Sequence, residues 1–198
     1  AFFHWYGGLA RRILRNFTHF FVQNDVSATL LKSIKIPSCT VSGDTRFDRV
    51  YQVVKQSDEI LSARYFKDTQ KVMVVGSCWP EDMEVLIPFI NENYFQLKFI
   101  IAPHEISENF LSTIENSLQV KCIRFSQIAP GQHLEEYQVL LIDNMGMLSR
   151  LYRYGEFAFV GGAFSKGLHN ILEAACYGVP IFFGNRNYEK FQEATDLI

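Results

Sequence analysis

The chain has 198 residues, of which 48% are hydrophobic and 20% are charged, so it has the apolar content of a packed globular protein and is not expected to be disordered. Its 19 Lys and Arg residues against 21 Asp and Glu residues give a formal net charge of −2, which excludes the strongly basic surface of a general nucleic-acid binder. An anionic ligand must therefore be held by a few placed groups or by helix ends.

Short apolar runs alternate with amphipathic stretches along the whole chain. The runs are rich in Val, Ile and Phe and predict strands covered on both faces, at residues 17–23, 39–42, 71–76, 97–102, 121–125, 138–142, 157–161 and 180–183. The stretches between them predict helices at residues 25–34, 49–65, 80–90, 105–117, 148–154, 170–177 and 188–197. This alternation indicates a doubly wound α/β fold with a parallel sheet.

A turn-prone segment, residues 43–48, follows the second strand and leads into a polar helical stretch. We therefore expect a domain junction within residues 43–60 and divide the chain into residues 1–45 and 46–198. The four cysteines form no CxxC pair and no zinc-type spacing with His, so we expect reduced thiols of a cytosolic protein and no metal site. We also expect the chain to be a piece of a longer protein, cut at both ends.

Ligands of open α/β sheets bind beyond the carboxyl ends of the strands, and four strand ends here carry unusual residues. After the third strand, Ser77 lies in a short loop before a helix that starts at Pro80, and such a loop can hold a phosphate; the alternative is an ordinary capped turn. After the fourth strand, Pro103 is followed by His104, which can donate to an anion when protonated, although a single His is often structural.

The loop after the strand at residues 138–142 contains Met145, Gly146 and Met147. Gly146 permits close approach of the backbone, whose N–H and C=O groups can then contact a base edge. The alternative is a turn that leads into a helix capped by Asn144.

The strongest candidate follows the strand at residues 157–161. Gly161 and Gly162 end that strand, and a helix is expected to begin near His169 and Asn170, so its free N–H groups can face a phosphate. In the first turn, the carboxylate of Glu173 can accept hydrogen bonds from two ribose hydroxyls; the alternative is a capping-box acid. The segment is neither a GxGxxG nor a Walker motif.

The ordered motifs resemble the 3-deoxy-D-manno-octulosonic acid (Kdo) transferases, in the form found in Bacteroidetes. The matching segments are VSGDTRFD (41–48), GSCWPED (76–82), IAPHE (101–105), IDNMGML (142–148), VGGAF (160–164) with NILEAA (170–175), and FGN (183–185). The resemblance covers nearly the whole chain. It departs from many family members at Pro103-His104, where they carry Pro-Arg-His.

The resemblance implies the C-terminal half of a GT-B glycosyltransferase, which pairs two Rossmann-like domains. It implies CMP-Kdo as donor, a lipid A precursor as acceptor, no metal at the transfer step and a role in lipopolysaccharide biosynthesis. The implied nucleotide-binding residues are Ser77, Pro103, His104, Met145, Gly146, Met147, Gly161, Gly162, Asn170, Ile171, Leu172 and Glu173.

The resemblance also assigns residues 1–45 to the end of an N-terminal acceptor domain, and residues 46–198 to a donor-binding domain truncated at its C-terminus. The rest of the acceptor domain would supply the membrane anchor at the cytoplasmic side of the inner membrane and the catalytic carboxylate. No catalytic residue is therefore expected in this chain, which alone would be inactive, and Glu81 and Asp82 are interpreted as acids of a helix start.

Two other functions are compatible with the same residues. The first is another GT-B enzyme that uses a UDP-sugar, a transferase or an epimerase. The second is a non-catalytic α/β module, in which aromatic residues near the start of the chain form an exposed binding patch.

Overall fold

The computed structural model describes residues 2–56 and 58–198 and consists of two compact units that divide between Arg49 and Val50. The division expected after residue 45 falls at the first residue of helix α3 (Thr45–Gln56), which runs across the observed division. The two units are described separately below.

The first unit contains helices α1 (Gly8–Leu14) and α2 (Asp25–Ser33) and two short parallel strands, β1 (Phe20–Val22) and β2 (Cys39–Val41). Helix α2 begins where the sequence predicts, because Asn24 Oδ1 accepts a hydrogen bond from the Ser27 N–H at 2.9 Å. Leu31, Ile34 and Ile36 form a small core in this unit.

The second unit is built on a six-stranded parallel sheet in the order β5-β6-β4-β3-β7-β8. Its strands are β3 (Val72–Cys78), β4 (Lys98–Pro103), β5 (Cys122–Arg124), β6 (Val139–Leu141), β7 (Phe157–Val160) and β8 (Ile181–Phe183). Each of the eight strand regions predicted for the whole chain contains a strand. The parallel α/β architecture is thus confirmed.

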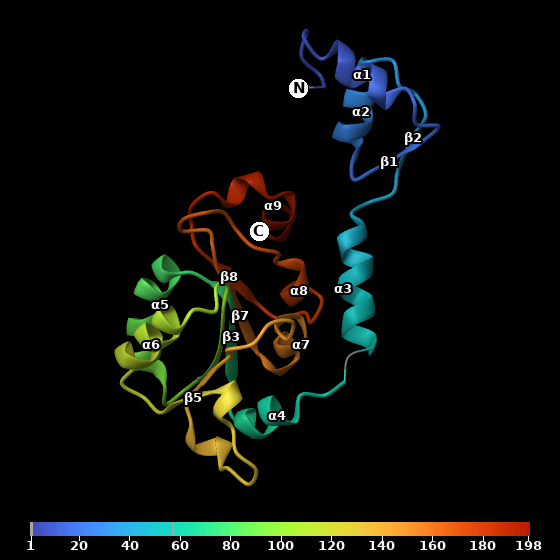
Figure 1. Ribbon diagram of the computed structural model, residues 1–198. Helices are drawn as coiled ribbons and strands as arrows, with labels where there is room; N and C mark the ends of the chain where they lie inside the picture. Colours follow the sequence, from blue (N-terminus) through green and yellow to red (C-terminus); the bar gives the residue numbers. More distant parts are fainter. Residues whose placement is uncertain (1, 57) are drawn as a thin grey trace. The chain divides into compact units, whose positions relative to one another are not determined.

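Helices cover both faces of this sheet (Figure 1). Helices α5 (Pro80–Asn93) and α6 (Glu108–Ser117) bury Met83, Ile90 and Ile114 against one face. Helices α4 (Leu61–Lys67), α7 (Leu148–Leu151), α8 (Leu172–Ala175) and α9 (Gln192–Leu197) contribute to the core on the other face, together with short 3₁₀ helices at Phe125–Gln127, Leu134–Glu136, Tyr152–Tyr154 and Tyr188–Lys190. The strands are apolar on both sides because both sides are covered.

Three predicted helices are shorter or interrupted, besides α6, which begins at Glu108 rather than at residue 105, and the stretch at 148–154, which is α7 followed by a 3₁₀ helix. The stretch at residues 49–65 contains α3 and α4, separated at the buried, extended Ile60, whose N–H donates to the Tyr154 hydroxyl at 2.6 Å. The stretch at 188–197 is interrupted at Phe191, which is also extended and packs on the core. The helix expected at 170–177 is reduced to α8. In the first two cases, burial of one apolar residue overrides the local helical pattern.

The strand order reverses between β3 and β7. From β3 the chain proceeds to β4 and then to β5 and β6 on one side, and it crosses back to place β7 on the other side of β3. The loops that leave β3 and β7 therefore diverge to opposite faces of the sheet. A crevice between such loops is where open α/β sheets bind their ligands.

Candidate functional site

The turn from β3 into α5, residues 77–82, is called the loop after β3 below; it begins with the last two residues of the strand, of which Ser77 is distorted. Ser77 has a φ of 52° and lies at an irregularity in the pairing with β4, after which Cys78 pairs with Pro103. Gly76 precedes it without a side chain because a Cβ there would lie 2.0 Å from the Tyr152 hydroxyl. Ser77 is half-buried and Cys78 is fully buried, so the backbone of this turn is held at the sheet edge.

Asp82 joins the loops that follow β3 and β7. Its Oδ2 accepts hydrogen bonds from the Trp79 N–H at 2.8 Å and from the Gly162 N–H at 2.9 Å. Its side chain is buried, and burial raises the pKa of the carboxyl above the ordinary value even though both N–H groups lower it. The interpretation of Asp82 as an acid of the helix start is correct but incomplete, because the same oxygen also holds a loop 80 residues away.

Gly161 and Gly162 are required by close approach. A Cβ on Gly161 would lie 2.5 Å from the Ser77 carbonyl oxygen and 2.6 Å from Asp82 Oδ2. Gly162 has a φ of 96°, and a Cβ there would lie 2.3 Å from the Gly167 carbonyl oxygen. Gly161 therefore lets the two loops pack backbone against backbone, whereas Gly162 lets its own loop fold closely onto Gly167 and His169.

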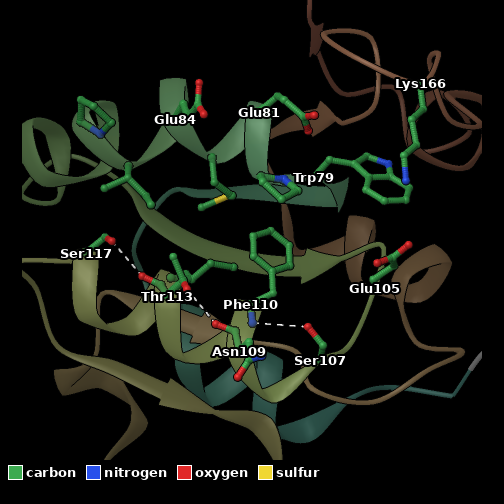
Figure 2. A pocket seen from close by; sticks show the side chains of 15 residues that line it. Trp79, Glu81, Glu84, Glu105, Ser107, Asn109, Phe110, Thr113, Ser117 and Lys166 are labelled. Carbon is green, nitrogen blue, oxygen red and sulfur yellow. Dashed lines mark hydrogen bonds between the residues drawn. The ribbon is translucent and has the colours of Figure 1, made fainter.

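A stack of rings lies over this junction. The Trp79 and His104 rings are 4.5 Å apart at 27°, and the His104 and His169 rings are 4.3 Å apart at 24°. Trp79 Nε1 donates to His169 Nε2 at 2.7 Å. Lys166 Nζ lies 3.6 Å from the centre of the Trp79 ring, and both of these side chains are labelled in Figure 2. Trp79 is buried, whereas His104 and Lys166 are exposed. The stack thus presents basic groups at its open side.

The segment before α8 combines buried and accessible residues. Ile171 and Leu172 are fully buried in the core, so only their backbone is available to a ligand. Asn170 and Glu173 are half-buried; Asn170 Oδ1 accepts from the Leu172 N–H at 3.2 Å, and Asn170 Nδ2 donates to Glu173 Oε1 at 3.3 Å. Burial, and then the charge of Glu173, raise the pKa of the Tyr152 hydroxyl.

The loop after β6 is held differently. Met145 is 77% exposed, and Gly146 has a φ of 88° with open space where a Cβ would lie. Met147 is buried in the core and directly precedes α7, so the alternative in which Asn144 caps that helix is wrong. Asp143 anchors the start of the loop by accepting hydrogen bonds from the N–H and hydroxyl of Ser126.

The structure brings together residues from three strand ends. The ring stack and Asp82 connect the loops after β4, β3 and β7, whose strands are adjacent, and the loop with Met145 follows β6, the next strand beyond β4. The sequence-based site lacks Trp79, Asp82, Lys166 and His169. Trp79 and Asp82 could have been found as the residues that flank the Pro80 helix start, and Lys166 and His169 lie inside the glycine segment already selected.

A groove with a volume of about 800 Å³ lies between α5 and α6 (Figure 2). Trp79 and Lys166 line it, but none of the twelve nucleotide-binding residues implied by the sequence does.

Within residues 2–56 and 58–198, no group of three or more His, Cys, Asp or Glu side chains is placed to hold a metal ion. In the same part of the chain, no helix is both long and apolar enough to cross a bilayer.

Comparisons with known proteins give consistent relatives. No family model matches the chain. It is 28% identical to the 3-deoxy-D-manno-octulosonic acid transferase of Rickettsia typhi over an aligned segment of 178 residues. This segment covers 87% of this chain and 37% of the relative. It is 32% identical over 120 residues to the transferase of Chlamydophila psittaci, which is 60% of this chain and 27% of the relative. The chain thus spans well under half the length of these relatives.

One solved structure matches the fold as well as the sequence. The crystal structure of the C-terminal CMP-Kdo binding domain of WaaA from Acinetobacter baumannii matches with a TM-score of 0.54 and 28% identity, over 77% of each chain. This chain is a homologue of the Kdo transferases. The resemblance noted in the motifs and the expected C-terminal GT-B fold are thereby confirmed.

Proposed function

We propose that this chain is the donor-binding part of a Kdo transferase and that its sheet edge holds the CMP group of CMP-Kdo. The observation that carries the proposal is the likeness, in sequence and fold, to a C-terminal CMP-Kdo binding domain. The crevice between the loops after β3 and β7 gives this likeness a physical basis, because glycine backbone and basic side chains converge there.

The proposed roles follow from accessibility and charge. The backbone N–H groups near Ser77 and Asn170, with the exposed His104 and Lys166, face the phosphate. The half-buried carboxylate of Glu173 accepts hydrogen bonds from the ribose hydroxyls. Exposed Met145 and the open backbone of Gly146 lie against the base.

The whole reaction needs parts beyond this chain. In the full enzyme, a carboxylate elsewhere deprotonates an acceptor hydroxyl of a lipid A precursor, at the cytoplasmic side of the inner membrane. The acceptor oxygen bonds to the Kdo anomeric carbon as the bond from that carbon to the phosphate oxygen breaks, and CMP leaves with the negative charge that the basic groups and N–H donors at the sheet edge stabilise. This chain then contributes donor binding and leaving-group stabilisation, in lipopolysaccharide biosynthesis.

Nucleotide selectivity tests this proposal. CMP and UMP are titrated into the chain by isothermal calorimetry at fixed ionic strength, and we expect CMP to bind and UMP to bind at least about tenfold more weakly, the cost of one or two lost base hydrogen bonds. A preference for UMP would favour a UDP-sugar enzyme, and absence of binding to either nucleotide would favour a non-catalytic module.

The carboxylate at the ribose is tested by Glu173→Gln. We expect CMP to bind about tenfold more weakly to this variant, since a hydrogen bond to a charged acceptor is lost. The discrimination of the unmodified chain against 2′-deoxy-CMP should also shrink in the variant. The matched control is Glu92→Gln, because Glu92 is exposed and lies near the C-terminal end of α5, the end opposite Trp79. Unchanged CMP affinity in Glu173→Gln would remove Glu173 from the site.

A further inference from the structure

The bond between Trp79 and His169 determines where the imidazole carries its proton. Trp79 Nε1 lies 2.7 Å from His169 Nε2, and an indole nitrogen is a hydrogen-bond donor only. His169 Nε2 must therefore accept, which means that it bears no hydrogen. The ring is then uncharged and its one N–H is on Nδ1.

The surrounding backbone holds both rings in place for this bond. The backbone N–H of Trp79 donates to buried Asp82, and the backbone N–H of His169 donates to the Gly161 carbonyl at 3.2 Å. Gly162 leaves the space that the imidazole occupies, since a Cβ there would lie 2.8 Å from His169 Cδ2. The pair is thus positioned by two loops that meet at the reversal of strand order.

The charges around His169 also oppose its protonation. His104, from the loop after β4, stacks on His169 at 4.3 Å, and Lys166 from its own loop lies over Trp79. Burial, and then the neighbouring His104, lower the pKa of His169. Asp82, on α5, is an acidic residue hydrogen-bonded to these loops: its Oδ2 accepts hydrogen bonds from the backbone N–H groups of Trp79 and Gly162.

We propose that Trp79 is a positioning residue that keeps the His169 ring uncharged, with its proton on Nδ1. In this state the Nδ1–H group donates a hydrogen bond to an anionic group of the bound nucleotide sugar. The ligand chemistry is that of a phosphate monoester, and this part of the inference rests on the proposed function. An uncharged donor that does not titrate near neutral pH gives a hydrogen bond of constant strength there, whereas an unrestrained imidazole would gain charge as the pH falls.

The tautomer can be measured without any ligand. A long-range ¹H–¹⁵N spectrum of the histidine-labelled chain contains five imidazoles, and His169→Gln identifies the signals of His169. We expect a protonated Nδ1 and an unprotonated Nε2 from about pH 6 to about pH 8, with no titration in that range. A protonated Nε2, or a ring that titrates near its ordinary value, would overturn the inference.

The role of Trp79 is tested by Trp79→Phe, with Trp5→Phe as the control because Trp5 is 90% exposed and lies in the first unit. In Trp79→Phe we expect the His169 signals to titrate and CMP affinity, relative to the unmodified chain, to increase as the pH falls. His169→Gln should weaken binding of CMP about tenfold while changing that of cytidine little, because the lost hydrogen bond goes to a charged group.

The outcomes separate this inference from the proposed function. If CMP does not bind but His169 carries its proton on Nδ1, the donor assignment fails and the positioning by Trp79 stands. If CMP binds but the pH profile of its affinity is the same in Trp79→Phe and Trp5→Phe, the positioning by Trp79 fails and CMP binding stands. Equal losses of CMP and cytidine affinity in His169→Gln would exclude the phosphate as the group that His169 contacts.

Discussion

Two loops at the same edge of the sheet are held in opposite ways. The loop after β3, residues 77–82, is fixed by buried hydrogen bonds to Asp82, by ring stacking and by backbone packed on Gly161. The loop after β6, residues 143–147, has an exposed Met145 and open space beside Gly146. One side of the candidate site is therefore preorganised, and the other is available to adjust to a ligand.

The difference has an energetic consequence for binding. Donors that are already positioned require no ordering when a ligand arrives, whereas an exposed side chain such as Met145 loses rotamer freedom. We infer that the rigid loop supplies the directional contacts with the charged phosphate, and that the open loop supplies adaptable contacts with the base.

The largest expected effect is on the free energy of unfolding, when a glycine of the rigid side is replaced and compared with a glycine of the open side. Gly161→Ala should lower the free energy of unfolding by about 3 kcal/mol, because its Cβ would meet backbone atoms of Ser77 and Cys78 that cannot move independently. Gly146→Ala should cost only about 1 kcal/mol, for its positive φ alone. Urea unfolding of both variants measures the difference; equal losses would mean that the two loops are not held differently.

A smaller loss is expected from Asp82→Ala. The N–H groups of Trp79 and Gly162 would lose their buried acceptor, which should lower the free energy of unfolding by about 2 kcal/mol. Asp82→Asn keeps one carbonyl oxygen as acceptor and is the matched variant, with a smaller expected loss. If Asp82→Ala unfolds at the same urea concentration as the unmodified chain, Asp82 does not join the two loops.

Because Asp82 can ionise, the contribution of its side chain to the free energy of unfolding depends on pH. Its folded pKa is raised above the ordinary 3.8 by burial, so the folded chain binds more protons than the unfolded chain between those two pKa values. Stability from this group therefore falls as the pH rises through that window and is recovered as the pH is lowered. The difference in unfolding free energy between the unmodified chain and Asp82→Asn should show this slope; a difference that grows with pH would contradict it.

The smallest effect on stability is expected on the open side. Met145→Ala should change the free energy of unfolding by no more than about 0.5 kcal/mol, since the side chain is exposed. Met145→Ala should nevertheless weaken CMP binding in calorimetry if the base lies against Met145. By contrast, Met83→Ala, at a buried position of α5, should mainly lower the free energy of unfolding. Unchanged CMP affinity in Met145→Ala would remove the loop after β6 from the site.

Much of the fold could be predicted because its determinants are local. The strands are continuous apolar runs, Asn24 caps α2, and Pro80 starts α5. The helix breaks at Ile60 and Phe191 could not be predicted, because each residue takes an extended backbone when it packs on a core formed by distant strands. The expected helix at 170–177 failed in part: Asn170 stays in the loop and bonds to the Leu172 N–H.

The sequence alone determined the parallel α/β class, the strand ends that carry the glycines, and the resemblance to Kdo transferases. Only the tertiary structure decided which of those ends meet, since local patterns do not specify the neighbours of a strand. The adjacency of β4, β3 and β7 places Trp79 against His169 and Asp82 against Gly162, across 90 and 80 residues of chain. Those contacts, rather than any single motif, determine the proton on His169 and the rigidity of the loop after β3.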